Sequence, residues 1–321
     1  MLRWLVNTIM YDGLGMNPES HLIRSLNFFI YDTIKILLLL FCMITIIGYL
    51  RSFLPQDKIK SWLKGKRLRG HFAASLFGAL TPFCSCSSIP IFLSFLRAGI
   101  PLGLTFSFLI TSPLINEYLV VLMLGFFGWE ITVLYIFSGL FIGVGAGLVI
   151  GQMKFEKYIV EDMLVPVDEE QATNDSALTH RDRFKFGLNE AVSIVRKLWL
   201  WIIVGVGLGA IIHNYVPQSA IQSISDKTGY FSVPLVTLIG VPLYGSCAAI
   251  IPIAVALFNK GIPLGTALSF MMAIAALSLP EAVMLRRAMK LPLILVFFGV
   301  TTLGIIIIGY LFNFWQVFIS I

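Results

Sequence analysis

Apolar residues are gathered along the chain in eight long stretches, which polar loops separate. Several stretches approach or exceed the ~20 apolar residues that a helix needs to cross the hydrocarbon core of a bilayer. They fall roughly at residues 28–53, 71–96, 101–127, 130–151, 192–213, 229–257, 262–285 and 291–318. The pattern predicts an all-α, polytopic membrane protein with about four apolar segments in each half of the chain.

The polar segments divide the chain into four parts. Residues 1–27 mix apolar with charged positions and suit an interfacial segment lying on the membrane. Residues 28–151 form a first transmembrane repeat, residues 152–190 a polar linker expected in the cytoplasm, and residues 191–321 a second transmembrane repeat.

Composition supports a membrane location. Of the 321 residues 58% are hydrophobic and 12% are charged, which is about half the charge of an ordinary soluble domain. This balance excludes a soluble enzyme, a disordered chain and a collagen-like repeat. The formal net charge is +6, and the basic residues lie in a few blocks. Membrane orientation explains these blocks, so we expect a lipid bilayer and no nucleic acid as a partner.

The two halves repeat each other at an offset of 162 residues. The run Gly99–Gly103 recurs residue for residue as Gly261–Gly265, and Pro90-Ile91 corresponds to Pro252-Ile253. Chance similarity between apolar helices rarely keeps glycines and prolines in register. The pattern therefore predicts an internal duplication.

The charges predict that the two repeats are inverted. The segment 51–70 carries seven basic residues against one acid, whereas the corresponding segment around 217–229 has only Asp226 and Lys227. Further along the sign reverses: the segment 286–290 is basic, and its counterpart near 126–130 has no basic residue. Because positive loops face the cytoplasm, equivalent loops are expected on opposite sides. Inversion needs an odd number of crossings in each half, so one of the four segments must be re-entrant or split.

Prolines inside the apolar stretches mark the expected helix breaks. They are Pro82, Pro90, Pro113, Pro242, Pro252 and Pro280. Each removes a helical hydrogen bond, and such breaks persist at membrane depth where the freed backbone is buried in protein or lines a cavity. Ordinary helix kinking is the alternative. Recurrence of the prolines in both halves favours broken helices around a substrate site near the midplane.

Two thiols and three hydroxyls lie between two of these prolines in Thr81–Pro90. Residues two apart in a regular helix point in opposite directions, so Cys84 and Cys86 face one ligand only where the backbone unwinds. Three thiolates suit a soft ion such as trivalent arsenic, antimony or monovalent copper, and would then be its metal ligands. The expected substrate-binding residues are Cys84, Cys86, Cys247, Ser85, Ser87 and Ser88. The alternative is that buried cysteines act as small hydrophobic residues.

Two carboxylates lie inside the apolar stretches beside the expected breaks. Glu117 follows Asn116, and Glu281 occupies nearly the matching position of the second half. A carboxylate at membrane depth is costly, so we expect Glu117, Glu281 and Asn116 to couple transport to protons. Glu281 is also close in sequence to Arg286, which leaves an interfacial ion pair as the alternative.

Several segments resemble the ArsP-like predicted permease family. They are Thr81–Pro90, Ala98–Gly103, Ser112–Glu117 and Gly245–Cys247, with further likeness at 15–21 and 29–35. The resemblance covers most of the chain and implies a multi-pass permease of the bacterial inner membrane. The best-understood branch of the family exports trivalent organoarsenicals and has cysteines associated with the substrate. Other branches are linked to efflux of divalent or soft metals.

These observations predict a permease rather than an enzyme, one that exports a small thiophilic solute: a trivalent organoarsenical, a metalloid or a soft metal ion. No ATPase motif of the GxxxxGK[ST] type occurs, so we expect an ion gradient to drive transport and no cofactor to be bound. Two alternatives stay open: a permease for another small anion or sulfur species, and a membrane thiol-redox protein that uses Cys84 and Cys86. A homo-oligomer is compatible with either.

Overall fold

The structure is a computed structural model that describes most of the chain. The described residues are 6–8, 10, 21–51, 67–81, 85–97, 99–153, 155–160, 180–215, 229–243, 247–259, 261–286 and 288–316. This described part is nearly all helical and has no β-strand, apart from an isolated bridge between Ile159 and Met289. The predicted all-α class is confirmed.

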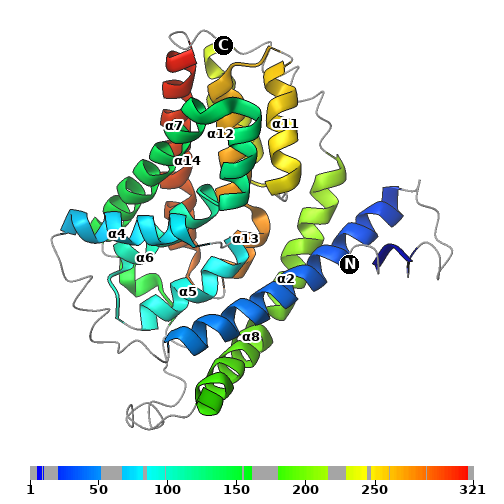
Figure 1. The fold of residues 1–321 in the computed structure, drawn as a ribbon, viewed down its shortest axis with the longest axis vertical. Coiled ribbons are helices and arrows are strands. Elements are labelled where there is room, and N and C mark those ends of the chain that lie inside the picture. Colours follow the sequence, from blue (N-terminus) through cyan, green and yellow to red (C-terminus); the bar gives the residue numbers. More distant parts are fainter. Residues whose placement is uncertain are drawn as a thin grey trace.

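The helices fall into two successive sets (Figure 1). The first set is α2 (His21–Arg51), α4 (Arg67–Leu80), α5 (Ser85–Arg97), α6 (Leu102–Leu114) and α7 (Glu117–Gln152), followed by the 3-10 helix η2 (Phe155–Tyr158). The second set is α8 (His180–Tyr215), the 3-10 helix η5 (Gly229–Phe231), α10 (Ser232–Gly240), α11 (Cys247–Asn259), α12 (Leu264–Ala276), α13 (Leu279–Leu285) and α14 (Leu291–Gln316).

Interruptions divide the predicted apolar stretches into short helices. Residues 81–84 separate α4 from α5, and residues 115–116 separate α6 from α7. In the second set, residues 241–246 separate α10 from α11, and residues 277–278 separate α12 from α13. Helices α5, α6, α11 and α12 have 13 residues each. At 1.5 Å per residue each is ~20 Å long, which is shorter than the ~30 Å hydrocarbon core of a bilayer.

The prolines lie at these interruptions in some cases and not in others. Pro113 is the last residue but one of α6, Pro242 follows α10, and Pro280 lies in the first turn of α13. Helix α5 continues through Pro90 and α11 through Pro252, so the breaks precede these two prolines rather than fall on them. A proline near a helix start gives up few hydrogen bonds, which is why both helices persist. Pro82 lies outside the described residues.

The same hairpin turn joins the short helices in both halves. Gly99 and Gly261 have positive φ angles of 73° and 90°, which favour glycine. The following amides close equivalent turns: Ile100 N–H donates to the Phe95 carbonyl at 3.0 Å, and Ile262 N–H donates to the Leu257 carbonyl at 3.2 Å. The limits of α5 and α11, and those of α6 and α12, differ by 162 residues at both ends. The helices therefore recur with the offset that the sequence predicted.

Helices α6 and α12 form the centre of the molecule. All 13 residues of α6 are buried, as are all residues of α12 except Ala275. Neither helix carries a charged residue, and a helix that is apolar on every side is stable only when it is surrounded. In the first half α6 packs against α4 and α7, and in the second half α12 packs against α10 and α14. Equivalent helices thus have equivalent neighbours.

Helices α2 and α8 form a long antiparallel pair beside this bundle, where Figure 1 shows them crossing. The Tyr49 hydroxyl is 3.0 Å from Nδ1 of His180, at the end of α2 and the start of α8. Close to the other ends, a Cβ on Gly207 would lie 3.5 Å from the Phe29 ring. Positions along α2 fall as those along α8 rise, so the two helices run in opposite directions.

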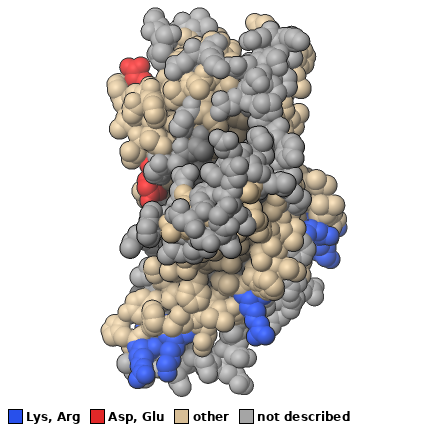
Figure 2. Space-filling model, turned by 90° about the vertical axis from the view of Figure 1, so that its right-hand side faces the viewer, with Lys and Arg blue, Asp and Glu red and all other residues tan. Residues whose placement is uncertain are grey.

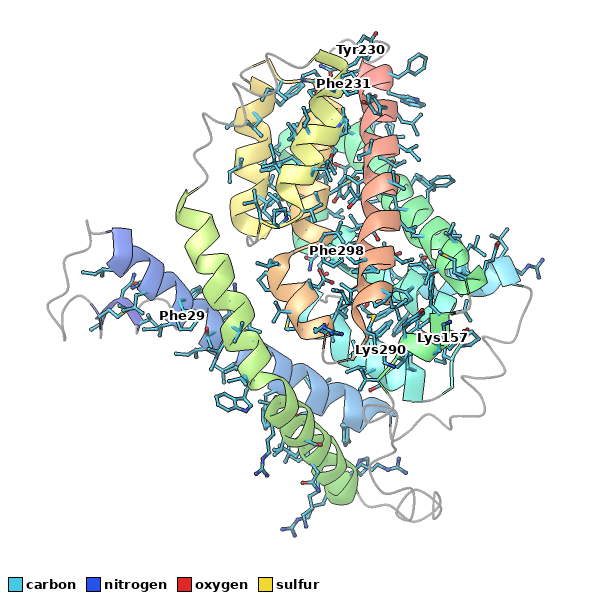
Figure 3. All side chains as sticks on the ribbon, turned by 180° about the vertical axis from the view of Figure 1, so that it is seen from behind. Phe29, Lys157, Tyr230, Phe231, Lys290 and Phe298 are labelled. Carbon is cyan, nitrogen blue, oxygen red and sulfur yellow. The ribbon has the colours of Figure 1, made fainter. Side chains whose placement is uncertain are left out.

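Charged and aromatic residues mark two ends of the molecule. Figure 2 shows Lys and Arg side chains toward the lower end of one face and Asp and Glu side chains toward the upper part. Figure 3 shows Lys157 and Lys290 side by side near the lower end, with Tyr230 and Phe231 at the opposite end. Tyr230 is 89% exposed. A basic end and an aromatic end fit the two faces of a membrane protein.

Three helical segments in the described part are long and apolar enough to cross a bilayer: Leu119–Gln152, Leu264–Leu285 and Leu291–Gln316. Large apolar side chains stand exposed on two of them, among them Phe141 and Leu303. A hydrocarbon environment covers such side chains without cost. The arrangement is that of a multi-pass membrane protein.

Candidate substrate and coupling site

The predicted substrate residues lie at the starts of two equivalent helices. Helix α5 begins at Ser85 and contains Cys86, Ser87 and Ser88 in its first turn, and α11 begins at Cys247. Ser85 and Cys247 are 162 residues apart and are therefore equivalent positions. Of this group the structure describes the side chain of Ser88, which is fully buried. Cys84, one residue before α5, and the side chains of the other members lie outside the described residues.

Each of these helices packs against the break-following helix of the other half. Helix α5 contacts α13, which carries Glu281, and α11 contacts α7, which begins at Glu117. The Phe127 and Phe258 rings mark the second contact, with centroids 5.8 Å apart. Residues far apart in sequence are thereby brought together, and the two contacts exchange the halves in the way that a two-fold arrangement requires.

Glu281 is fully buried in the first turn of α13. The hydroxyl of Ser278 caps this helix by accepting a hydrogen bond from the Glu281 N–H at 3.3 Å. Pro280 supplies the fixed φ angle that suits a helix start, which explains why the break lies here. Helix α13 also packs against α8, so the carboxyl group is enclosed by parts of both halves.

Glu117 has a different environment, because it is exposed at the first residue of α7. Asn116 is partly buried in the break, and its carbonyl accepts a hydrogen bond from Val120 N–H at 2.9 Å. The equivalent bond in the second half joins Ala282 N–H to the Ser278 carbonyl at 3.0 Å. Asn116 and Ser278 are therefore equivalent, while Glu117 and Glu281 are offset from each other by two positions.

The sequence predicted no role for His71 and an interfacial place for Asp32, and both side chains are buried. His71 lies in the second turn of α4, where Nδ1 is 2.8 Å from the hydroxyl oxygen of Ser107 on α6. A polar residue on an apolar helix face was the available signal for each. The sequence alone does not show which face of a short helix is covered.

No cluster of three His, Cys, Asp or Glu side chains suitable for a metal occurs among the described residues. The predicted thiol ligands are not among the side chains that this search covers. Cys42, in α2, is a free and exposed cysteine.

The fold defines a helical integral membrane protein whose two halves each contain broken helices that meet at the centre. The sequence profile of the predicted permease family matches residues 21–314, so the chain belongs to this family, the ArsP-like family that the motifs resemble.

Curated relatives are distant but extensive. The chain is 22% identical over 266 residues to a protein of Streptococcus mutans named as a subunit of a two-component membrane permease complex, covering 81% of this chain and 85% of that protein. It is 22% identical over 275 residues to the UPF0718 protein YcgR of Bacillus subtilis, covering 86% and 92%. A UPF0718 protein of Methanocaldococcus jannaschii is 20% identical, covering 74% and 80%. No solved structure matches the chain.

Proposed function

We propose that the chain is a proton-driven permease that exports a small thiophilic solute, such as a trivalent organoarsenical, a metalloid or a soft metal ion. Family membership supports transport. The observation that carries the proposal is the exchanged packing of α5 on α13 and of α11 on α7. This packing joins the helix starts that carry Cys86 and Cys247 to the helices that carry the two acids. A substrate site and a proton site in contact are what coupled transport requires.

The substrate is held by Cys84, Cys86 and Cys247, with Ser85, Ser87 and Ser88 lining the site. Thiolates bind soft ions more strongly than hydroxyl or carboxylate groups do. The first turns of α5 and α11 also present backbone N–H groups, as the half-helices of secondary transporters do. Glu281 is the principal proton carrier in this scheme because it is buried beside α5, and Glu117 and Asn116 serve the equivalent break.

The halves of this permease are inverted. Helices α2 and α8 are equivalent by the 162-residue offset and run antiparallel, which supports inversion. A Cβ on Gly304 would lie 3.2 Å from Cγ2 of Ile142, its own equivalent, as expected for residues near a two-fold axis. The basic end that contains Lys157 and Lys290 faces the cytoplasm of a bacterial cell, together with the linker 152–190.

Transport into everted membrane vesicles tests the proposal. Vesicles from a bacterial host that lacks its own arsenic efflux proteins are energised and given phenylarsine oxide, antimonite, monovalent copper or phosphate. We expect accumulation of one of the first three that collapses when a protonophore is added. Replacing Cys84, Cys86 and Cys247 by serine should abolish it, while Cys42→Ser, the exposed control, should leave it intact.

Undiminished accumulation in the triple serine variant would contradict the thiol site. Accumulation of phosphate alone would favour an anion permease. A mixed disulfide trapped between this chain and a thioredoxin-like protein, without transport of any probe, would favour the thiol-redox alternative.

The name of the Streptococcus mutans relative supports a further part of the proposal, that the chain acts with a partner subunit or a second copy of itself. Measuring the mass of the purified complex in lipid discs tests it, and a mass equal to one chain would contradict it.

A further inference from the structure

A buried histidine lies where three helices of the first half meet. His71 of α4 is 5% exposed, and its Nδ1 is 2.8 Å from the Ser107 hydroxyl oxygen of α6. Glycines of α7 close the junction: a Cβ on Gly147 would overlap the Ser107 hydroxyl, and one on Gly151 would lie 4.0 Å from Cε1 of His71. The imidazole is thus held between helices that approach each other closely.

Packing alone does not require this imidazole. The equivalent junction of the second half, between α10, α12 and α14, has Val233 in the position of His71. Val233 packs against Gly309, the equivalent of Gly147, at a Cβ distance of 2.7 Å. Ser269, the equivalent of Ser107, donates its hydroxyl to the Thr266 carbonyl of its own helix at 3.0 Å. An apolar residue therefore fills the place, and the first half retains a titratable group there.

A second polar level lies one helical turn further into the same junction. Ser75 of α4 is fully buried, and its hydroxyl oxygen has no hydrogen-bond partner among the described residues. A Cβ on Gly143 would lie 3.1 Å from this oxygen and would overlap the hydroxyl of Thr111. Because an unpaired buried hydroxyl costs free energy, access of water to this level would stabilise it.

The charged groups around His71 do not offer it an anion. On α4 itself Arg67 and Arg69 precede it, and Arg69 is exposed. Helix α6 has no charged residue, and the acids of α7 are Glu117 and Glu130. Glu130 is 17 residues from Gly147 in sequence, which is ~25 Å along a helix. An imidazolium in this junction would be a buried charge without a counter-charge from these helices, which is costly unless water enters.

From this arrangement we propose that His71 binds a proton during the transport cycle and that proton binding opens the junction of α4 with α6 and α7. This rests on the proposed function of a proton-driven permease. Histidine is the side chain that gains or loses a proton near neutral pH. Because the closed junction disfavours the charged ring, proton uptake shifts the population toward a state in which water reaches it. Helix α6 leads directly to the break at Asn116, so the movement is transmitted to the candidate coupling site.

Thiol labelling measures the opening without any substrate. Single cysteines are placed at Ser75 or at its buried equivalent Thr237, in a full chain whose four native cysteines are serine. The ratio of alkylation rates at positions 75 and 237 cancels the pH dependence of the reagent. An accessible histidine is about nine-tenths protonated at pH 5.5, so the ratio should rise by up to about tenfold between pH 8 and pH 5.5.

Two substitutions make the result specific to His71. His71→Gln keeps a hydrogen-bonding group but takes up no proton, and His71→Val copies the second half. In both, the ratio should stay constant with pH, and size-exclusion profiles should match the parent. A ratio that does not change in the chain with His71, or that rises equally in His71→Gln, would overturn the proposal.

Vesicle transport separates this inference from the proposed function. If phenylarsine oxide is accumulated by the unaltered chain and equally by His71→Gln over the same pH range, His71 has no part in coupling and the inference fails. If the unaltered chain accumulates none of the probes, the proposed function fails, and the labelling ratio still decides whether His71 opens the junction.

Discussion

The two halves have the same helices but different chemistry at three equivalent places. A buried carboxyl occurs in the second half at Glu281, where the first half has the buried Leu119. The buried imidazole of His71 faces Ser107, where the second half has Val233. The comparison teaches that duplication preserved the backbone, while the groups able to carry protons were divided between the halves.

The starts of the central helices differ in the same way. In the second half the Asn313 side chain accepts a hydrogen bond from Gly265 N–H at 2.7 Å, and Gln316 accepts one from Leu264 N–H at 2.8 Å. In the first half the equivalent of Asn313 is Gly151, and no side chain caps α6. The start of α12 is held more firmly than that of α6, so the comparison predicts that α6 is the more mobile of the two.

Removing the buried carboxyl should have the largest effect on function. Glu281→Gln keeps the shape of the side chain but carries no proton, so export should become uncoupled. A pH gradient of one unit, worth ~1.4 kcal/mol per proton, sustains about a tenfold substrate gradient, and this gradient should be lost in everted vesicles. Glu117→Gln, at the exposed position, should lower accumulation less. An equal loss in the two variants would contradict the assignment of Glu281 as the principal carrier.

Filling a helix contact should have the largest effect on stability. A Cβ on Gly265 would overlap the Gly309 carbonyl and would lie 2.8 Å from the Asn313 nitrogen, and neither backbone atom can move without separating α12 from α14. Gly265→Ala should therefore lower the free energy of unfolding by ~1–3 kcal/mol, measured by denaturation in mixed micelles. Gly145 has open space around its Cβ position, so Gly145→Ala is the matched control and should cause no loss. Equal stability of the two variants would be inconsistent with this packing.

A smaller loss is expected when a cap is removed. Asn313→Ala leaves the Gly265 N–H without its acceptor, which should cost ~0.5–2 kcal/mol in the same denaturation experiment. Asn313→Asp retains an acceptor and should stay close to the parent chain. If Asn313→Ala unfolds with the parent, the proposed difference in firmness between α12 and α6 is not present.

Much of this organisation was predictable because it depends on local features of the chain. The Gly-Ile-Pro-Leu-Gly run fixes a positive φ at one residue and a helix start at the next but one, so the duplicated hairpins follow directly. Glu281 stood out because a carboxylate is rare in an apolar stretch. The positions of the breaks were less predictable, since Pro90 and Pro252 are tolerated inside short helices whose ends depend on packing.

Tertiary packing decided what could not be predicted. The pairing of α2 with α8 and the contact of α5 with α13 join residues more than a hundred positions apart, and no local pattern specifies them. The burial of His71 depends on glycines of α7, which the sequence indicated only as a general packing face. A side chain's exposure in a short helix follows from the neighbours that cover it.

The central claim is that the two halves are inverted, and topology labelling tests it most directly. Single cysteines replace Lys157, Lys290 or Tyr230 in a cysteine-free chain, and intact cells receive a membrane-impermeant maleimide. The account predicts labelling of the Tyr230→Cys chain in intact cells, and labelling of the Lys157→Cys and Lys290→Cys chains only after the membrane is opened. Labelling of all three from the same side would contradict it.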